Sequence, residues 1–248
     1  CSVGTSAEPS APRVVLNEIM YHPPGDREDL QFLELHNAGD VAADVSRWSL
    51  CGGVDFAFPR GCLIEPRGFA VVCRSLAAFK ACYGDVPSLV GAFTGSVSRK
   101  GERIELRDDR GQLVEAVEYG DRPPWPVAAD GHGASLERVC AAVSPADASN
   151  WCASEVHSGA GMGGTPGQAN GCVSLQPLPR IDRVQSDSPI PGQPTRVSAE
   201  VTDEAGVAAV TLLWESWLGD EAIGGGEVPL VRDTDSSGPE RYGGCIPA

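Results

Sequence analysis

Methionine is scarce in these 248 residues, whereas glycine and proline are abundant. There are 2 Met against 30 Gly and 20 Pro. This composition is typical of short strands joined by tight turns, and it argues against a helical bundle. The sequence also lacks any apolar run near the ~20 residues that a membrane-spanning helix requires. The chain is therefore expected to be an all-β protein without a transmembrane helix.

Positive charge is also in short supply. Lys and Arg total 19 and Asp and Glu total 34, which gives a formal net charge of -15. A negative field repels phosphate backbones, so nucleic acid is not expected as a partner. The run Gly224-Gly225-Gly226 has no Gly-Lys-Ser/Thr ending with which to hold a phosphate, and no cofactor is predicted.

Signatures of metal and nucleophilic sites are missing. No CxxC pair occurs, and the four histidines form neither HxxxH nor HExxH. Ser135 lacks the following Gly that a nucleophile elbow requires. The sequence therefore predicts no metal ligands, no catalytic residues and no enzymatic activity.

The chain starts at Cys1 and continues to residue 12 with small, polar and proline residues. Such a stretch is typical of a flexible tether. A first cysteine followed by a tether resembles a processed bacterial lipoprotein, which makes Cys1 a lipidation candidate and its lipid the only expected link to a membrane. The alternative is an arbitrary boundary at this residue.

Short periodic segments predict most of the secondary structure. In Phe32–Asn37, Leu33 and Leu35 alternate with Glu34 and His36, which indicates a half-buried strand. Other expected elements are strands at Val14–Met20, Phe69–Cys73 and Ala134–Cys140, a hairpin of Glu102–Arg107 with Gln112–Tyr119, and a helix at Leu76–Tyr83 capped by Ser75. Residues 173–179 are expected to link this block to a second β block, 180–248.

Several motifs together resemble the lamin-tail domain in its bacterial form. They are Leu16-Asn17-Glu18-Ile19, Phe32-Leu33-Glu34-Leu35-His36-Asn37, Trp48-Ser49-Leu50, Phe58-Pro59, Gly101–Leu106, Gly133–Glu137, Asn150-Trp151 and Thr165–Asn170. The resemblance runs from about Val14 to Asn170 and implies an immunoglobulin-like β-sandwich over 13–172. Residues 180–248 resemble the Ig-like module that often follows such a domain in secreted bacterial proteins, with the final strand or strands missing.

Eight cysteines besides Cys1 suit disulfides formed in an oxidising compartment, although free thiols in a cytosolic protein are the alternative. They are Cys51, Cys62, Cys73, Cys82, Cys140, Cys152, Cys172 and Cys245. Eight cysteines allow 105 connectivities. Short connections within the lamin-tail-like block favour Cys51–Cys62, Cys73–Cys82 and Cys140–Cys152, which leaves Cys172 with Cys245.

Polar residues at strand ends have two interpretations. Asn17, Glu18, Glu34 and Asn37 could form a catalytic carboxylate pair with amide helpers, but their placement beside turns favours hydrogen bonds that tie strand ends together. Trp125 lies among prolines, where it could anchor a ligand or else pack at the edge of the sandwich.

These observations predict a non-catalytic binding or scaffold module in the extracellular space or cell envelope. Its expected partner is a protein or a cell-surface ligand. The alternative is the targeting portion of an exported enzyme whose catalytic domain, kinase-like or nuclease, lies outside this chain.

Overall fold

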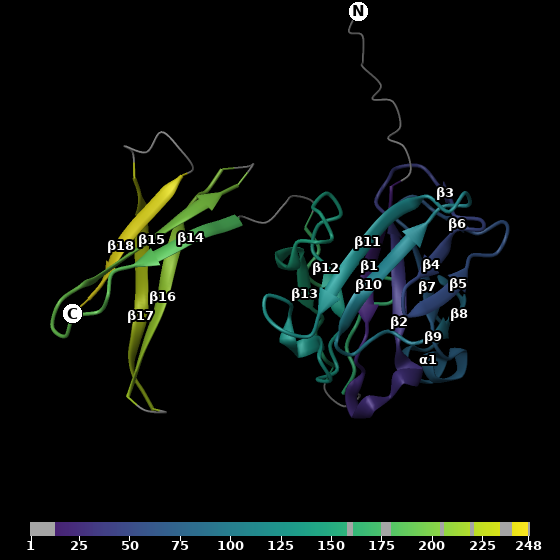
Figure 1. The fold of residues 1–248 in the computed structure, drawn as a ribbon, viewed down its shortest axis with the longest axis horizontal. Coiled ribbons are helices and arrows are strands. Elements are labelled where there is room, and N and C mark those ends of the chain that lie inside the picture. Colours follow the sequence, from purple (N-terminus) through teal and green to yellow (C-terminus); the bar gives the residue numbers. More distant parts are fainter. Residues whose placement is uncertain are drawn as a thin grey trace, which may run out of the picture. The chain divides into compact units, whose positions relative to one another are not determined.

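The chain divides into two compact units, Cys1–Gln176 and Pro177–Ala248 (Figure 1). The structure is a computed structural model, and it describes residues 13–157, 161–174, 180–203, 206–218, 221–233 and 240–247. The expected tether 1–12, with the lipidation candidate Cys1, lies outside the described residues. The division between the units falls within 173–179, the expected linker.

The first unit is built around a six-stranded sheet. In spatial order its strands are β13 (Trp151–Ala153), β12 (Leu136–Arg138), β1 (Val14–Met20), β2 (Phe32–Asn37), β7 (Phe69–Cys73) and β8 (Leu89–Ala92). Neighbouring strands are antiparallel, except that β8 runs parallel to β7. Every residue of β1 is buried, so both faces of the sheet are covered at its centre.

A five-stranded sheet covers one face of the first. Its strands are β11 (Leu113–Gly120), β10 (Gly101–Arg107), β4 (Ser49–Cys51), β5 (Val54–Ala57) and β9 (Thr94–Gly95), and a separate pair is formed by β3 (Ala43–Asp44) and β6 (Leu63–Ile64). Leu16 and Leu33 from the first sheet share one buried cluster with Leu50, Ile104 and Val117 from the second. The two sheets therefore form a β-sandwich with a single main core.

A short helix, α1 (Leu76–Tyr83), covers part of the opposite face. Ser75 caps it by accepting from the Ala78 N–H at 3.3 Å, and Gly84 ends it with a φ of 75°. Phe79 packs edge-on against Phe32 of β2, and both are buried. The expected helix is confirmed. Within the helix Phe79 is buried, whereas Leu76 at its start is 44% exposed.

The other helices are single 3₁₀ turns: η1 (Pro24–Asp26), η2 (Glu28–Leu30), η3 (Val127–Ala129) and η4 (Ala148–Asn150). Among the described residues, no helix has the length and apolar character needed to cross a bilayer.

The second unit contains one five-stranded antiparallel sheet. Its order is β14 (Arg180–Ser186), β15 (Thr195–Thr202), β18 (Arg241–Ile246), β17 (Glu221–Arg232) and β16 (Val210–Leu218). Its buried apolar cluster is small and consists of Ala199, Val201, Leu230 and Tyr242. The predicted all-β chain, a sandwich followed by a second β domain, is confirmed. The described strands of this second domain form a single sheet.

Candidate functional site

Three glutamates lie side by side across adjacent strands of the six-stranded sheet. Glu18 of β1 is directly opposite Glu137 of β12 on one side and Glu34 of β2 on the other. Their exposures are 0%, 1% and 0% for Glu18, Glu137 and Glu34. Because neighbouring strands are about 4.8 Å apart, three ionised carboxylates here would repel one another strongly.

A β-bulge on β1 sets the direction of these side chains. The register of β1 against β2 shifts between Leu16 and Glu18, so Leu16 points into the main core while Glu18 points to the opposite face. The bulged Asn17 donates to Glu34 Oε1 at 2.7 Å and to Asn170 Oδ1 at 2.8 Å. Asn170 donates in return to the Asn17 carbonyl at 3.1 Å.

Residues 161–174 are here called the cover segment. They lie over the row formed by Glu18, Glu34 and Glu137 and supply a backbone donor to each of the three glutamates. The Thr165 N–H donates to Glu18 Oε1 at 3.0 Å, and the Gly167 N–H donates to Glu34 Oε2 at 2.6 Å. The Gly171 N–H donates to Glu137 Oε2 at 2.7 Å. Hydroxyl groups add to these bonds: Ser135 donates to Glu18 at 2.6 Å and Thr165 donates to Glu137 at 2.9 Å. The cover segment has little regular structure, yet its backbone satisfies the buried carboxyl groups.

Burial raises the pKa of two of the three glutamates, Glu18 and Glu34. Desolvation, with a smaller contribution from the charge of Glu137, raises the pKa of Glu18 to about 8 against the lowering effect of its hydrogen bonds. Desolvation also raises the pKa of Glu34 well above its ordinary value, with the charge of Glu18 as the next cause. A carboxyl group that is neutral near pH 7 is suited to general acid catalysis if a substrate can reach it.

The backbone of the cover segment leaves no such access at Glu18. Gly164 has a φ of 99°, and a Cβ placed on it would lie 2.8 Å from Glu18 Oε1 and 3.3 Å from the Phe32 ring. A cavity of 310 Å³ lies beyond the segment, between Tyr83, Pro87 and Pro166, but none of the three glutamates is among its lining residues. Within the described residues, the cover segment therefore separates the three glutamates from this cavity.

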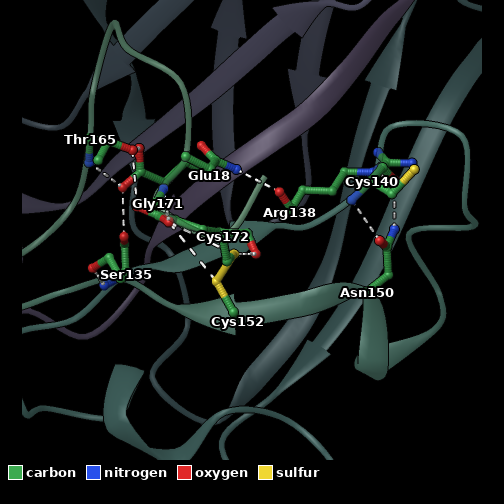
Figure 2. Close-up of a disulfide and its surroundings, with 12 residues drawn as sticks. Glu18, Ser135, Arg138, Cys140, Asn150, Cys152, Thr165, Gly171 and Cys172 are labelled. Carbon is green, nitrogen blue, oxygen red and sulfur yellow. Dashed lines mark hydrogen bonds between the residues drawn. A yellow bond between two sulfur atoms is a disulfide. The ribbon is translucent and has the colours of Figure 1, made fainter. Parts of the chain in front are cut away.

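A disulfide fastens the cover segment to the sheet (Figure 2). It joins Cys152 of β13 to Cys172, and the Cα atoms of the two residues are 6.6 Å apart. Cys152 lies opposite Glu137 in the β12–β13 ladder. Both sulfur atoms lie 3.9 Å from Glu137 Oε2, so the bond lies beside the end of the glutamate row.

Residues 7–121 match the family model of the Lamin Tail Domain. The predicted resemblance to a lamin-tail domain, which extended from about Val14 to Asn170, is confirmed as far as residue 121. Lamin tail domains are immunoglobulin-like, in agreement with the sandwich of the first unit. Comparison with curated proteins gave no match, and neither did comparison with solved structures.

The lamin-tail match contains Glu18 and Glu34 but ends before Glu137 and the cover segment. The expected hydrogen-bonding role is confirmed, but a strand end is tied only at Asn37, the last residue of β2, which donates to the Ile64 carbonyl at 3.0 Å. Asn17, Glu18 and Glu34 lie within their strands and bond to the cover segment instead. The expectation that β2 is only half-buried is wrong for Glu34. The face of the sheet on which Glu34 lies is covered by residues more than 130 positions later in the chain.

The predicted cysteine pairs are corrected by the structure. Cys152 bonds to Cys172, so Cys140–Cys152 and Cys172–Cys245 are wrong. Cys140 is a buried thiol whose backbone N–H donates to Asn150 Oδ1 at 2.8 Å, and Cys245 is exposed on β18 of the second unit. Proximity in sequence favoured Cys140 for Cys152, but the fold brings Cys172 to it instead.

The pairs Cys51–Cys62 and Cys73–Cys82 are also wrong, because all four residues are free thiols. Cys51 alternates with the buried Leu50 and so faces away from the core against which Cys62 packs. The Cys73 thiol points at the Gly91 carbonyl of β8 at 3.8 Å. Burial raises the pKa of Cys73 to about 11, which makes its thiol unreactive.

Trp125 is partly buried rather than projecting into solvent. It packs against the main core, and its ring centroid lies 6.1 Å from that of Trp151. This position matches the alternative in which Trp125 packs at the edge of the sandwich.

The sequence motifs contain Glu137 and Thr165, but no role was predicted for either residue or for Arg138. Arg138 is 2% exposed and forms an ion pair with Glu115 of β11 at 2.9 Å, which links the two sheets. Glu115 also accepts from the Leu16 N–H at 2.6 Å. The available signal was a single glutamate in each of three predicted strands. These glutamates become neighbours only because the three strands are adjacent in the sheet, and the sequence does not give the order of strands.

Proposed function

We propose that the chain is a non-catalytic binding or scaffold module that presents its sandwich and loops to a partner. The observation that carries this proposal is that the cover segment lies over the row of Glu18, Glu34 and Glu137 and keeps it buried. Their carboxyl oxygens accept hydrogen bonds from the cover segment, and Gly164 lies too close to Glu18 for a substrate to enter. A carboxyl row of this kind supports a structural role, because its bonds hold the cover segment on the sheet.

The net charge and the disulfide bear on the partner and the compartment. A formal charge of -15 favours a protein or a neutral cell-surface ligand over nucleic acid. The disulfide Cys152–Cys172 supports an oxidising environment, as in the extracellular space or the cell envelope. Within this proposal the chain is of the bacterial secreted or lipoprotein type, Cys1 carries the lipid, and residues 180–248 form an Ig-like module.

The proposal is tested on the purified full chain in two arms. In the first arm, turnover of model esters, phosphoesters and glycosides is measured for wild type, Glu18→Gln and Glu155→Gln. Glu155 is an exposed residue just beyond β13 and serves as the matched control. We expect no turnover above buffer in any of the three proteins. Turnover that Glu18→Gln abolishes and Glu155→Gln retains would contradict the proposal.

In the second arm, deuterium uptake is compared with and without cell-envelope material from the source organism. We expect protection at exposed loops or strand edges of the sandwich, while uptake at β1 stays as low as in the free protein. Uptake that is identical everywhere with and without the envelope material would contradict a surface-binding role.

A further inference from the structure

Two sulfur atoms and one carboxylate oxygen converge at the end of the glutamate row. The ligand-type atoms of Glu137, Cys152 and Cys172 all lie within 4.8 Å of one another. The three residues are distant in sequence and come from β12, β13 and the cover segment. In the oxidised protein the two sulfurs are bonded to each other, so neither has a thiolate to offer to a metal.

The distances are close to those of a tetrahedral metal site. With Zn–S bonds of about 2.3 Å and a Zn–O bond of about 2.1 Å, tetrahedral geometry places a sulfur about 3.6 Å from the oxygen and two sulfurs about 3.8 Å apart. The structure has both sulfurs 3.9 Å from Glu137 Oε2. Reduction removes the sulfur–sulfur bond, so the two cysteine side chains are then free to rotate and move their sulfurs apart.

The surrounding hydrogen bonds hold the carboxylate in place. Gly171 donates to Oε2 of Glu137 and Thr165 donates to Oε1, at 2.7 Å and 2.9 Å. Donors of this kind orient a metal ligand from outside the coordination sphere. The pairing of Glu137 with Cys152 belongs to the β12–β13 ladder, whose backbone bonds do not depend on the disulfide.

We propose that in the reduced protein Cys152, Cys172 and Glu137 bind one thiophilic divalent cation of the Zn²⁺ class, with water in the fourth position. A dithiol reductant supplies two electrons and two protons, the sulfur–sulfur bond breaks, two thiols form and the reductant becomes a disulfide. The cation then forms two metal–sulfur bonds and displaces two thiol protons. The disulfide and the metal exclude each other, and each fastens the cover segment to the sheet.

The test uses Co²⁺ added to the full chain, which is reduced with a phosphine and desalted without oxygen. Tetrahedral Co²⁺ bound by thiolates gives visible d–d bands and an ultraviolet thiolate-to-cobalt band. We expect both bands in the reduced wild type and neither in the oxidised protein. Cys51, Cys62, Cys73, Cys82, Cys140 and Cys245 are free thiols in the oxidised protein as well, so they serve as an internal control.

Variants assign the ligands. In the reduced state Cys152→Ser and Cys172→Ser should each lose the ultraviolet band, and Glu137→Gln should weaken Co²⁺ binding by at least about tenfold. Glu155→Gln, the exposed matched control, should bind as wild type does. Circular dichroism of each variant verifies that the sheets are intact.

Two results would overturn the proposal. One is a reduced wild type without the thiolate-to-cobalt band. The other is Co²⁺ binding at wild-type affinity in either cysteine variant or in Glu137→Gln, because the cation would then be held elsewhere or without the carboxylate.

Discussion

Glu18 lies at the centre of a carboxyl row that the folded protein removes from water. Its burial is complete, and its neighbours across both ladders are also glutamates. Protonation relieves the repulsion, while the N–H groups of the cover segment solvate the charge that remains. The folded state therefore holds protons that the unfolded chain releases near the ordinary pKa of glutamate.

This difference predicts a pH dependence of stability. The folded pKa of Glu18 is about 8, raised from 4.5. Its contribution is therefore fully present below pH 4.5 and is lost as the pH rises to about 8. The free energy of unfolding should fall over this window by up to about 1.4 kcal/mol per pH unit for one proton. Urea unfolding between pH 5 and 8 measures the slope.

Glu18→Gln is the matched variant for this slope, because glutamine stays neutral at every pH. The fall in stability between pH 5 and 8 should be smaller in Glu18→Gln than in wild type, and unchanged in Glu155→Gln. Parallel pH profiles for wild type and Glu18→Gln would show that Glu18 is ionised in the folded protein.

Gly164 provides a second test at the residue scale. Both Gly164 and Gly161 have positive φ values, 99° and 62°, but a Cβ on Gly161 would meet nothing within 4 Å. Gly164→Ala should therefore lower the free energy of unfolding by about 1–3 kcal/mol more than Gly161→Ala, through strain and contact with Glu18. Equal losses in the free energy of unfolding for the two variants, measured by chemical denaturation, would mean that the cover segment leaves room for a side chain next to Glu18.

At the scale of elements, the bonds that hold the cover segment on the sheet include three backbone N–H bonds to the buried carboxyl groups and one disulfide. A stretch rich in glycine is poorly suited to regular structure, because each glycine loses much conformational freedom on ordering. The bonds to the buried carboxyl groups offset this loss. An irregular segment can thus be as firmly placed as a strand.

Removing the disulfide should loosen this segment in particular. The bond closes a loop with a sequence separation of 20, so its loss should lower the free energy of unfolding by about 3 kcal/mol in the chain-entropy account. Hydrogen exchange of Cys152→Ser in the presence of a metal chelator should be faster at 165–171, with little change at β10. Acceleration spread evenly over the sandwich would indicate that the segment does not open separately.

At the scale of the whole molecule, the two units differ in the size of their cores. Among the described residues, the main buried cluster of the first unit has 23 apolar residues, whereas the buried cluster of the second has four. In the second unit, β14 and β16 are edge strands of the described sheet, and each has one side without a neighbouring strand there. Because its buried apolar cluster is smaller, we expect the second unit to be the less stable of the two.

Native-state hydrogen exchange tests this difference. Protection at Thr195–Val201 and Val207–Trp214 should be well below protection at Ile104–Leu106 of β10, because the latter lies within the larger core. Equal protection in the two units would mean that the second gains stability from contacts beyond its four-residue cluster.

Local patterns in the sequence were sufficient for much of the fold. Alternation placed β2, short apolar segments placed β1 and β7, turn residues placed the β10–β11 hairpin, and the Ser75 cap placed the start of α1. Composition predicted the all-β class. Each of these properties depends on residues close together in the chain, or on sums over the whole of it, so the sequence alone determines them.

Tertiary structure decided the site. Asn17, Glu18 and Glu34 were recognisable as polar strand residues, but their burial depends on the cover segment, which begins at residue 161. The disulfide partner of Cys152 depends on where Cys172 comes to lie, and nearby Cys140 was the wrong choice. Such facts depend on strand order and long-range distance. Residue spacing does not encode these, because the same local pattern is compatible with many arrangements of strands.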